Sequence, residues 1–239
     1  MCTVTLLPLS EDSFILTSNR DESISRRTIY PKIYEEKDVT ILYPKDKEAG
    51  GTWIGISSRK RMICLLNGGF KKHNRKQAYR KSRGIVVTDL LKVSNFEKGI
   101  AAYNFSDIEP FTLVVADWNA TLTCNEIVWD GKVLHKRKLE HKIHIWSSST
   151  LYTDDMKEKR KEWLNSFVNT TVMDANSLLD FHKYGGQGYK SYDIQMDRGE
   201  LKTRSITQII KSKEEIEMRY EDLINEEVKT ISFEGATIY

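Results

Sequence analysis

The stretch MCTVTLLPLSEDSFILTSNRDES (1–23) contains two β-rich runs, TVTLLPL and SFILTS, which are separated by the polar turn SED. This pattern predicts a β-hairpin. If the hairpin folds about that turn, the numbers of paired residues sum to about 21 or 22. Cys2 then faces Asn19 or Arg20 across the ladder, and Asp21 lies just beyond. The pattern therefore predicts that the two ends of the hairpin form a single site.

The rest of the sequence alternates between strand and helix patterns. Apolar residues over 82–105 are spaced for one helical face, and two further helices are expected at about 153–168 and 174–184. The other β-rich runs are DVTILYP, TWIGIS, MICLLN, FTLVVADW, TLTCNEIVWD, GKVLHKRKL, HKIHIWSSS, LKTRSITQII, EEIEMRYEDL and KTISFE. Many antiparallel strands flanked by two groups of helices predict a layered α+β fold. Because no linker or internal repeat divides the sequence, residues 1–239 are expected to form one domain.

The composition is that of an ordinary globular protein. Of the 239 residues, 39% are hydrophobic and 30% are charged, and a net charge of +3 does not by itself indicate a nucleic-acid partner. The three cysteines Cys2, Cys64 and Cys124 do not form a disulfide framework, which favours a reducing compartment. The sequence has no signal-peptide pattern and no apolar run of about 20 residues, so we expect a soluble, cytoplasmic protein without a transmembrane segment.

Cysteine at the second position has a chemical consequence if Met1 is removed, which is expected before so small a residue. Cys2 would then carry both a thiol and a free α-amine. The reference pKa of an α-amine is about 7.7–8.0, so near neutral pH part of it can accept the thiol proton. A nearby Arg20 would favour the thiolate, and Asp21 could orient the amine or hold its ammonium form. In the simpler interpretation, Cys2 is incidental and the Arg-Asp pair is a surface ion pair.

These residues also carry a family resemblance. MCT followed by a strand, a turn and SNRDES resembles the NRDE family, also called the transport and Golgi organisation protein 2 family. The resemblance continues in order through LYPKDKEAGGTW (42–53), CLLNGGF (64–70), SRG (82–84), PFTLVVAD (110–117) and HIWSSSTLY (144–152).

The NRDE family is in turn similar to the N-terminal nucleophile hydrolases of the cholylglycine hydrolase and penicillin V acylase type. This resemblance implies a four-layer αββα sandwich of two mainly antiparallel sheets. It also implies that Cys2 is the nucleophile and that Arg20 and Asp21 lie beside it. The acylases place a spacer between their Arg and Asp, whereas the two residues are adjacent in this chain.

The resemblance suggests further site residues. Asn67, before two glycines, would be an oxyanion donor, although a turn-forming Asn-Gly is a structural alternative. Arg204 in KTRSITQ resembles a late arginine near the acylase nucleophile and could equally be a surface strand residue. Where the acylases have a late oxyanion Asn, this chain reads WSSSTLY. Ser148 or Ser149 could replace that donor or could instead cap the following helix. Together with Asn19, these serines are expected to contact the ligand.

Two charged patterns invite other functions. The run KKHNRKQAYRKSRG (71–84) could bind phosphate, anionic lipid or nucleic acid, but a solvated loop and helix start is the favoured interpretation. His135, His141 and His144 lack the close spacing of a zinc site. On a strand, His141 and His144 would point to opposite faces. We therefore expect no metal.

Two other patterns have structural interpretations. The glycine-rich YGGQGYKS (184–191) lacks Walker A spacing and is expected to be a turn or a helix C-terminus. Cys64 and Cys124 lie in apolar runs, which predicts that both belong to the core.

Two functions are compatible with these residues. In the first, the protein is an N-terminal cysteine hydrolase, or a related acyl transferase, acting on a non-peptide C–N amide bond of a small molecule. In the alternative, which the family resemblance suggests, the same fold handles haem or a lipid-like ligand, and Cys2 ligates or senses it without catalysis. The missing late Asn favours the alternative, whereas Cys2, Arg20 and Asp21 favour the hydrolase. Neither function requires a resident cofactor or a nucleic-acid partner.

Overall fold

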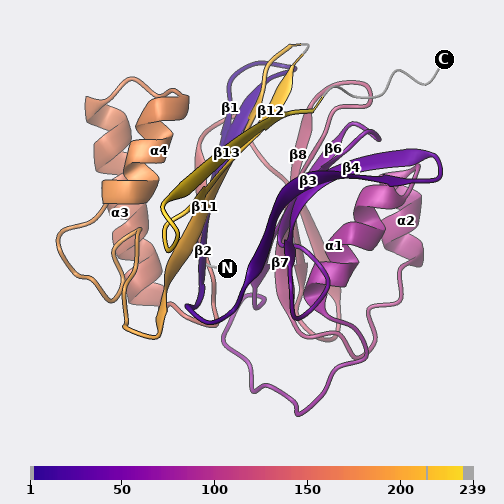
Figure 1. Cartoon of the computed structure of the whole chain (residues 1–239), viewed down its shortest axis with the longest axis horizontal. Coiled ribbons are helices and arrows are strands. Elements are labelled where there is room, and N and C mark those ends of the chain that lie inside the picture. Colours follow the sequence, from indigo (N-terminus) through magenta and orange to yellow (C-terminus); the bar gives the residue numbers. More distant parts are fainter. Residues whose placement is uncertain (1–2, 214, 234–239) are drawn as a thin grey trace. The chain divides into compact units, whose positions relative to one another are not determined.

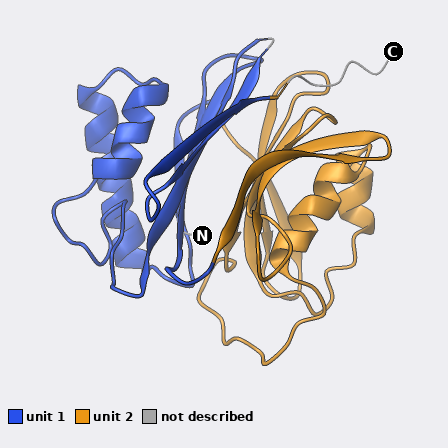
Figure 2. Ribbon diagram, viewed as in Figure 1, with its two compact units in different colours: residues 1–26, 141–232 blue, residues 27–140, 233–239 orange. Residues whose placement is uncertain are grey.

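The computed structural model describes residues 3–213 and 215–233, which form two compact units (Figures 1 and 2). One unit combines the first 26 residues with residues 141–232, and the other contains residues 27–140. Each unit contains an antiparallel sheet and a pair of helices. The α+β class expected from the sequence, with two antiparallel sheets and two separate groups of helices, is therefore confirmed.

The first unit is built on a six-stranded sheet in the order β10-β1-β2-β11-β12-β13. Helix α4 contacts β2 and β11, and helix α3 contacts β10, so both helices cover one face of this sheet (Figure 1). The bounds of these elements are β1 Thr3–Pro8, β2 Phe14–Ser23, β10 His144–Ser147, α3 Asp154–Thr170, α4 Ala175–Tyr184, β11 Leu201–Lys211, β12 Ile216–Asp222 and β13 Glu227–Ser232. Strands from both ends of the chain therefore lie side by side in one sheet.

The N-terminal hairpin has the expected register. Thr3 pairs with Asn19 and Pro8 pairs with Phe14, so the numbers of paired residues sum to 22. Strand β2 extends beyond the predicted SFILTS because β11 pairs with it as far as Ser23. The Asn-Arg-Asp-Glu cluster therefore lies within a central strand of the sheet and not after it.

The second unit is built on a seven-stranded sheet in the order β3-β4-β5-β6-β7-β8-β9. Helix α1 packs on β4, β5 and β6, and α2 packs on α1. The bounds are β3 Thr28–Glu36, β4 Val39–Asp46, β5 Ile54–Ser57, β6 Arg61–Asn67, α1 Arg83–Lys92, α2 Phe96–Ala102, β7 Phe111–Asp117, β8 Thr123–Trp129 and β9 Leu134–Lys138. At the start of α1, Gly51 and Gly84 approach so closely that a Cβ on Gly51 would lie 2.3 Å from the carbonyl carbon of Gly84.

The structure corrects two expectations about secondary structure. Strand β3 has no counterpart among the predicted strands. It contains Pro31 and shifts register between Ile29 and Lys32, which an edge strand can accommodate because one side of its backbone is unpaired. The single helical pattern over 82–105 is two helices. The backbone is extended at Asn95, whose side chain accepts a hydrogen bond from the Lys98 N–H and caps α2.

The helices of the first unit agree with the predicted segments. Helix α3 begins after its N-cap Thr153, and α4 begins after Asp174, which forms a capping box with Ser177. Helix α4 ends at Tyr184, and the N–H of Gly185 donates to the carbonyl of Phe181 at 2.9 Å, so the glycine-rich run begins at a helix C-terminus as expected. Among the described residues, no helix is both long and apolar enough to cross a membrane.

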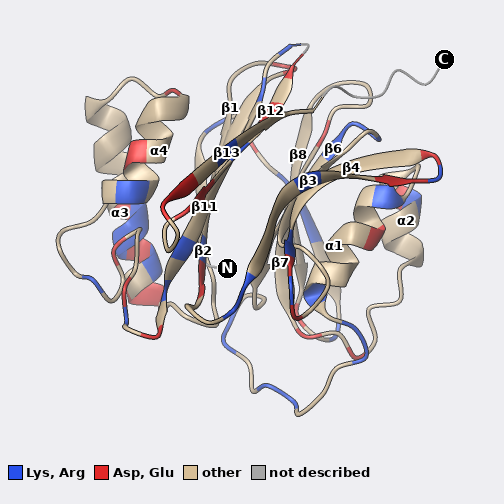
Figure 3. Cartoon of the chain, in the orientation of Figure 1, with Lys and Arg blue, Asp and Glu red and all other residues tan. Residues whose placement is uncertain are grey.

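The basic run 71–84 covers the loop that leads into α1 and the first two residues of that helix (Figure 3). Much of its charge is paired within the second unit. Glu109, only 8% exposed, lies 3.2 Å from His73 Nε2 and 3.1 Å from Arg83 Nη2. Lys76 lies 2.9 Å from Asp107. These ion pairs give the run a structural role in fastening its loop to the segment before β7.

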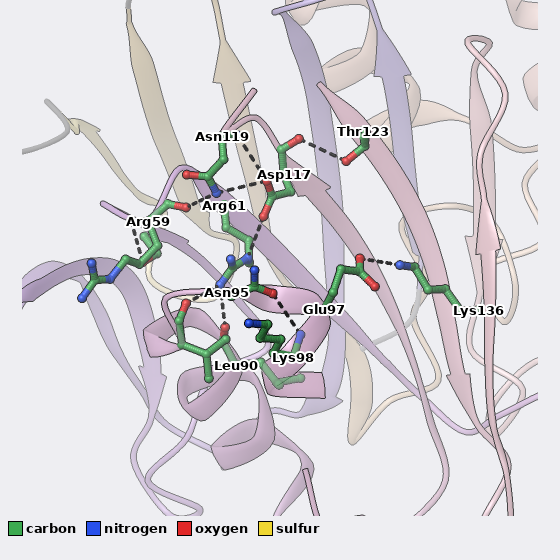
Figure 4. A network of polar contacts seen from close by, with 12 residues as sticks. Arg59, Arg61, Leu90, Asn95, Glu97, Lys98, Asp117, Asn119, Thr123 and Lys136 are labelled. Atoms are coloured by element: carbon green, nitrogen blue, oxygen red, sulfur yellow. Dashed lines mark hydrogen bonds and ion pairs between the residues drawn. The ribbon is translucent and has the colours of Figure 1, made fainter. Parts of the chain in front are cut away.

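A buried guanidinium joins the sheet of the second unit to its helices (Figure 4). Arg61 on β6 is completely buried, and its Nε donates to Asp117 at 3.0 Å. Its Nη1 donates at 3.0 Å to the carbonyl oxygens of Leu90 and Val93, at the end of α1 where backbone acceptors lack helical partners. Burial lowers the pKa of Arg61 from its ordinary value, and Asp117 opposes this shift. The bonds thus offset the cost of burying the charge.

Replacing Arg61 with methionine should destabilise the protein strongly. Arg61→Met keeps the apolar stem but leaves Asp117 and two helix-end carbonyls without their donor. We expect a loss of about 3 kcal/mol in the free energy of unfolding, measured by urea denaturation.

Arg59→Met is the matched control, because Arg59 pairs with Asp38, whose side chain is 77% exposed. Such a surface pair is worth about 1 kcal/mol or less. Equal losses for the two variants would contradict a structural role for the buried guanidinium.

Candidate functional site

Strand β2 sends alternate side chains to opposite faces of its sheet. Asn19 and Asp21 bond to groups on or near the helices, so they lie on the face covered by α3 and α4. Arg20 lies on the other face. The Asn-Arg-Asp cluster therefore divides its side chains between two environments.

Asn19 holds β2 to α4. Its Nδ2 donates to the carbonyl oxygens of His182 and Ile194 at 3.0 and 2.8 Å, and its Oδ1 lies 2.7 Å from His182 Nδ1. Because an amide oxygen only accepts, Nδ1 carries the imidazole proton. His182 Nε2 then accepts from the hydroxyl of Thr5 at 2.8 Å. Both ring nitrogens are therefore engaged, and Asn19 acts here as a positioning residue.

The buried imidazole stays neutral. Complete burial, with a smaller contribution from the positive charge of Arg160, lowers the pKa of His182 to about 3. A neutral histidine with two satisfied nitrogens is not available as a general base. Its role is to join β1, β2 and α4.

Asp21 is bound by two hydroxyl groups. It is 2% exposed, and its carboxylate accepts from Tyr152 Oη at 2.5 Å and from Thr203 Oγ1 at 2.6 Å. The guanidinium carbons of Arg160 and Arg198 lie 3.6 and 5.4 Å from the centroid of the Tyr152 ring. Asp21 is therefore part of a buried polar network and not a surface ion pair.

Arg160 fixes the beginning of β1. Its completely buried guanidinium donates to Thr3 Oγ1 at 2.6 Å and to Ser147 Oγ at 3.2 Å. It also donates to the carbonyl oxygens of Tyr192 and Asp193 at 2.9 and 2.6 Å. One side chain of α3 thus ties together β1, β10 and the segment before β11. The residue that it holds, Thr3, directly follows Cys2 in the chain.

Hydroxyl groups surround Arg20 on the opposite face. Arg20 pairs with Ser205 on β11, and Ser18 pairs with Thr207, so these side chains share one face of the sheet. Ser18, Ser205 and Thr207 are completely buried, and within the described parts of the chain their hydroxyl oxygens have no hydrogen-bond partner. Buried polar groups normally find partners. This face therefore offers hydrogen-bonding capacity beside a guanidinium.

Arg204 and the two serines are also buried. Arg204 lies where the β2–β11 register shifts, is 5% exposed and donates to the carbonyl oxygen of Ile24, so the interpretation as a surface residue is wrong. Ser148 and Ser149 are 1% and 6% exposed. The interpretation that these serines cap the next helix is also wrong, because Thr153 caps α3.

The structure thus brings part of the predicted site together. Asn19, Arg20, Asp21 and Arg204 lie on the adjacent strands β2 and β11, and Ser148 and Ser149 follow β10, which pairs with β1.

The remaining two predicted residues are placed differently. Cys2 lies outside the described residues. Asn67 ends β6 in the other unit, where it pairs with Phe111 and precedes Gly68, whose φ is +87°. Its turn geometry agrees with an Asn-Gly turn, and its role as an oxyanion donor stays a prediction.

The other sequence patterns add no chemistry to this site. Cys64 and Cys124 are buried in β6 and β8 as expected, and burial raises the pKa of Cys124 to about 11. Over residues 3–213 and 215–233, no group of three or more His, Cys, Asp or Glu side chains is arranged to hold a metal ion.

Four residues of the polar network are missing from the sequence-based prediction: His182, Tyr152, Thr203 and Arg160. Tyr152 and Thr203 belong to motifs that were identified, HIWSSSTLY and KTRSITQ, so their hydroxyls could have been considered as partners of Asp21. No local pattern marks His182, which is 163 residues away from Asn19. Its contact depends entirely on how α4 packs on β2.

The sequence match to a known family covers almost the whole chain. The family described as Transport and Golgi organisation 2 matches residues 1–229. The chain belongs to this family. The resemblance carried by the Asn-Arg-Asp-Glu motif is thereby confirmed. No curated protein sequence matches the chain.

Solved structures share the fold of this family member at low sequence identity. Penicillin V acylase from Agrobacterium tumefaciens has a TM-score of 0.58 at 11% identity, over 97% of this chain and 86% of the acylase. The Caenorhabditis elegans ortholog of N-acylethanolamine-hydrolyzing acid amidase has a TM-score of 0.59 at 12% identity, over 87% and 92% of the two chains. A variant of the conjugated bile acid hydrolase from Clostridium perfringens has a TM-score of 0.53 at 12% identity, over 98% and 92%. The expected fold of the N-terminal nucleophile hydrolases is therefore confirmed.

The neutral His182 should make stability depend on pH. In the unfolded chain its pKa returns to the ordinary value of 6.5, whereas in the folded chain it is about 3. Between these pH values the unfolded state binds one more proton at His182 than the folded state does. The contribution of His182 to the free energy of unfolding is therefore fully present above pH 6.5 and is lost as the pH falls toward 3. We expect His182→Gln to lower the slope of unfolding free energy against pH by up to about 1.4 kcal/mol per pH unit.

His141→Gln is the control for urea unfolding measured across this pH range. His141 is exposed, so its replacement should leave the wild-type slope unchanged. Identical slopes for His182→Gln and the wild type would show that His182 is not held neutral by the fold.

Proposed function

We propose that the protein is an N-terminal cysteine hydrolase, or a related acyl transferase, that acts on a non-peptide C–N amide bond after removal of Met1. The observation that carries the proposal is the strand register at the start of the chain. Thr3 pairs with Ser147 on one side and with Asn19 on the other. Ser148 and Arg20 follow these two partners of Thr3, and we propose that both act on Cys2, the residue before Thr3 in the chain.

In this arrangement the two charged residues act on different parts of Cys2. Arg20, whose side chain lies on the face opposite the helices, favours the thiolate form of the thiol. Asp21 is one residue further along β2, and we assign to it the role of holding the free α-amine when Met1 is absent. The bonds from Tyr152 and Thr203 hold the Asp21 carboxylate in place. A nucleophile and a base are thus supplied by one residue.

The proposed reaction proceeds through a thioester. The α-amine takes the thiol proton, and Sγ forms a bond to the amide carbonyl carbon, which moves negative charge to the carbonyl oxygen. The C–N bond then breaks, and the ammonium group returns the proton to the leaving nitrogen. Water, deprotonated by the same amine, attacks the thioester and releases the acid and the thiol. In an acyl transferase, a different nucleophile replaces the water.

The proposed mechanism also needs donors for the carbonyl oxygen. We assign this role to Ser148 or Ser149, the buried serines that follow β10. The hydroxyls of Ser18, Ser205 and Thr207 beside Arg20 suit a substrate with polar or anionic groups near the amide.

The names of the structural relatives support the proposed class of bond. The three similar structures are named as an acylase, an amidase that hydrolyses N-acylethanolamines and a hydrolase of conjugated bile acids. These names support a small amide as the proposed substrate class of this chain.

The first test asks whether Cys2 is a nucleophile. Intact mass should show that the purified protein lacks one methionine residue. We expect an electrophilic β-lactam probe to label the protein once, at the N-terminal cysteine, and Cys2→Ala to abolish the labelling.

Cys124→Ala is the matched control and should be labelled like the wild type, because burial raises the pKa of that thiol to about 11. Equal labelling of Cys2→Ala and the wild type would refute the proposed nucleophile. If the processed protein is not labelled but retains haem or a fatty acid, the hydrolase is contradicted and the binding function is favoured.

The second test concerns Arg20. Arg20→Met should slow the alkylation of Cys2 by iodoacetamide at neutral pH by about tenfold, because loss of the neighbouring positive charge disfavours the thiolate. Arg20→Lys keeps that charge and should retain most of the rate. The rate is measured by mass spectrometry of the N-terminal peptide. Similar rates in both variants would exclude an electrostatic role for Arg20.

A further inference from the structure

A groove lies between helices α3 and α4 of the first unit. Its volume is about 620 Å³, which is in the range of small-molecule sites. It is separate from Arg20, because the helices cover the other face of the sheet. The groove is lined by Trp163, Ser166, Phe167, Thr170, Asp180, Phe181, Tyr184, Gly185, Gly186 and Gln187.

Aromatic rings form much of this groove. Trp163 and Phe181 are 9% and 1% exposed and belong to the apolar cluster beneath the helices, with Phe167 packed against it. The rings of Phe167 and Phe181 lie 5.4 Å apart. Tyr184 is 77% exposed at the end of α4, so a large aromatic side chain remains accessible to a ligand.

Residues 185–187 form the wall of the groove that follows α4, and hydrogen bonds of backbone N–H groups hold this wall in place. The N–H of Gly185 donates to Phe181, and the N–H of Ile194 donates to the carbonyl of Gly185 at 3.0 Å. The N–H of Gln187 donates to the Asp193 carboxylate at 3.0 Å. A side chain at Gly185 would lie 2.5 Å from the Phe181 carbonyl, so glycine is needed where the wall turns. The groove is therefore preformed.

The charge of the groove is negative. Asp180 is the charged residue of the lining, and the lining contains no Lys, Arg or His. Asp180 is exposed, and no ion pair or hydrogen bond engages its carboxylate within the described residues. The nearby Lys183 is paired with Glu221 at 2.8 Å. A carboxylate without a cation therefore lies beside several aromatic rings.

We propose that this groove binds a small organic cation, such as a quaternary ammonium group that carries an apolar substituent. The faces of aromatic rings attract cations within about 6 Å, and Trp is the strongest of them. The apolar substituent lies on Trp163, Phe167 and Phe181, and the cationic group lies near Tyr184 and Asp180. An anion such as a fatty acid is disfavoured by the same carboxylate.

The test compares benzyltrimethylammonium with phenylacetate, which has a similar ring but the opposite charge. Binding to the full-length protein is measured by calorimetry and by the fluorescence of Trp163, with Trp163→Phe identifying the signal. We expect saturable binding of the cation and at least tenfold weaker binding of phenylacetate. Cys2→Ala should bind the cation like the wild type, so this result is independent of the proposed hydrolase.

Two substitutions at exposed positions locate the site without disturbing the core. Asp180→Asn and Tyr184→Leu should each weaken cation binding about three- to tenfold. Asp155→Asn, which removes an exposed carboxylate of α3 outside the groove, should have no effect. Equal binding of cation and anion, no saturable binding of the cation, or wild-type affinity in both groove variants would overturn the proposal.

Discussion

The candidate site depends on the position of β2 between β1 and β11. Because β2 is paired on both sides, its side chains can point only to one face of the sheet or to the other. Asn19 and Asp21 therefore point toward the helices, and Arg20 points away from them. A shift of the register by one residue would exchange all three environments. The hairpin register thus determines which residues of β2 hold the helices and which lie on the opposite face.

The buried polar groups on the helix side explain how this register is held. Burying an amide, a carboxylate, an imidazole and a guanidinium is costly unless each finds partners. Asn19 bonds to His182, Asp21 bonds to Tyr152 and Thr203, and Arg160 bonds to Thr3. An alternative register would leave several of these groups unpaired, so the network selects one pairing as well as stabilising it.

The sequence was informative where the relevant contacts are local. The polar SED turn and the flanking β-rich runs were enough to predict the hairpin register to within one residue, and the segments of α3 and α4 were also predicted from the local sequence. Strand β3 was missed because its pattern contains Pro31, which only its position at the sheet edge makes acceptable. The partners of Asn19 and Asp21 come from segments more than 130 residues away, as for Tyr152 and Asp21. No periodicity in the sequence reports such contacts, because they arise from tertiary packing.

The adjacency of Arg20 and Asp21 has a geometric consequence for the proposed chemistry. Neighbouring residues of a strand cannot both approach a ligand bound on one face. A spacer like that of the acylases gives a different relation between the two side chains, so their roles cannot be transferred unchanged. In this chain the guanidinium and the carboxylate have separate environments. The guanidinium lies among hydroxyls that have no hydrogen-bond partner among the described residues, and the carboxylate is bound by Tyr152 and Thr203. The division suits the proposed mechanism, in which the thiol and the α-amine of one residue need different partners. Arg20 can then act on the thiol and Asp21 on the amine without competing for the same position.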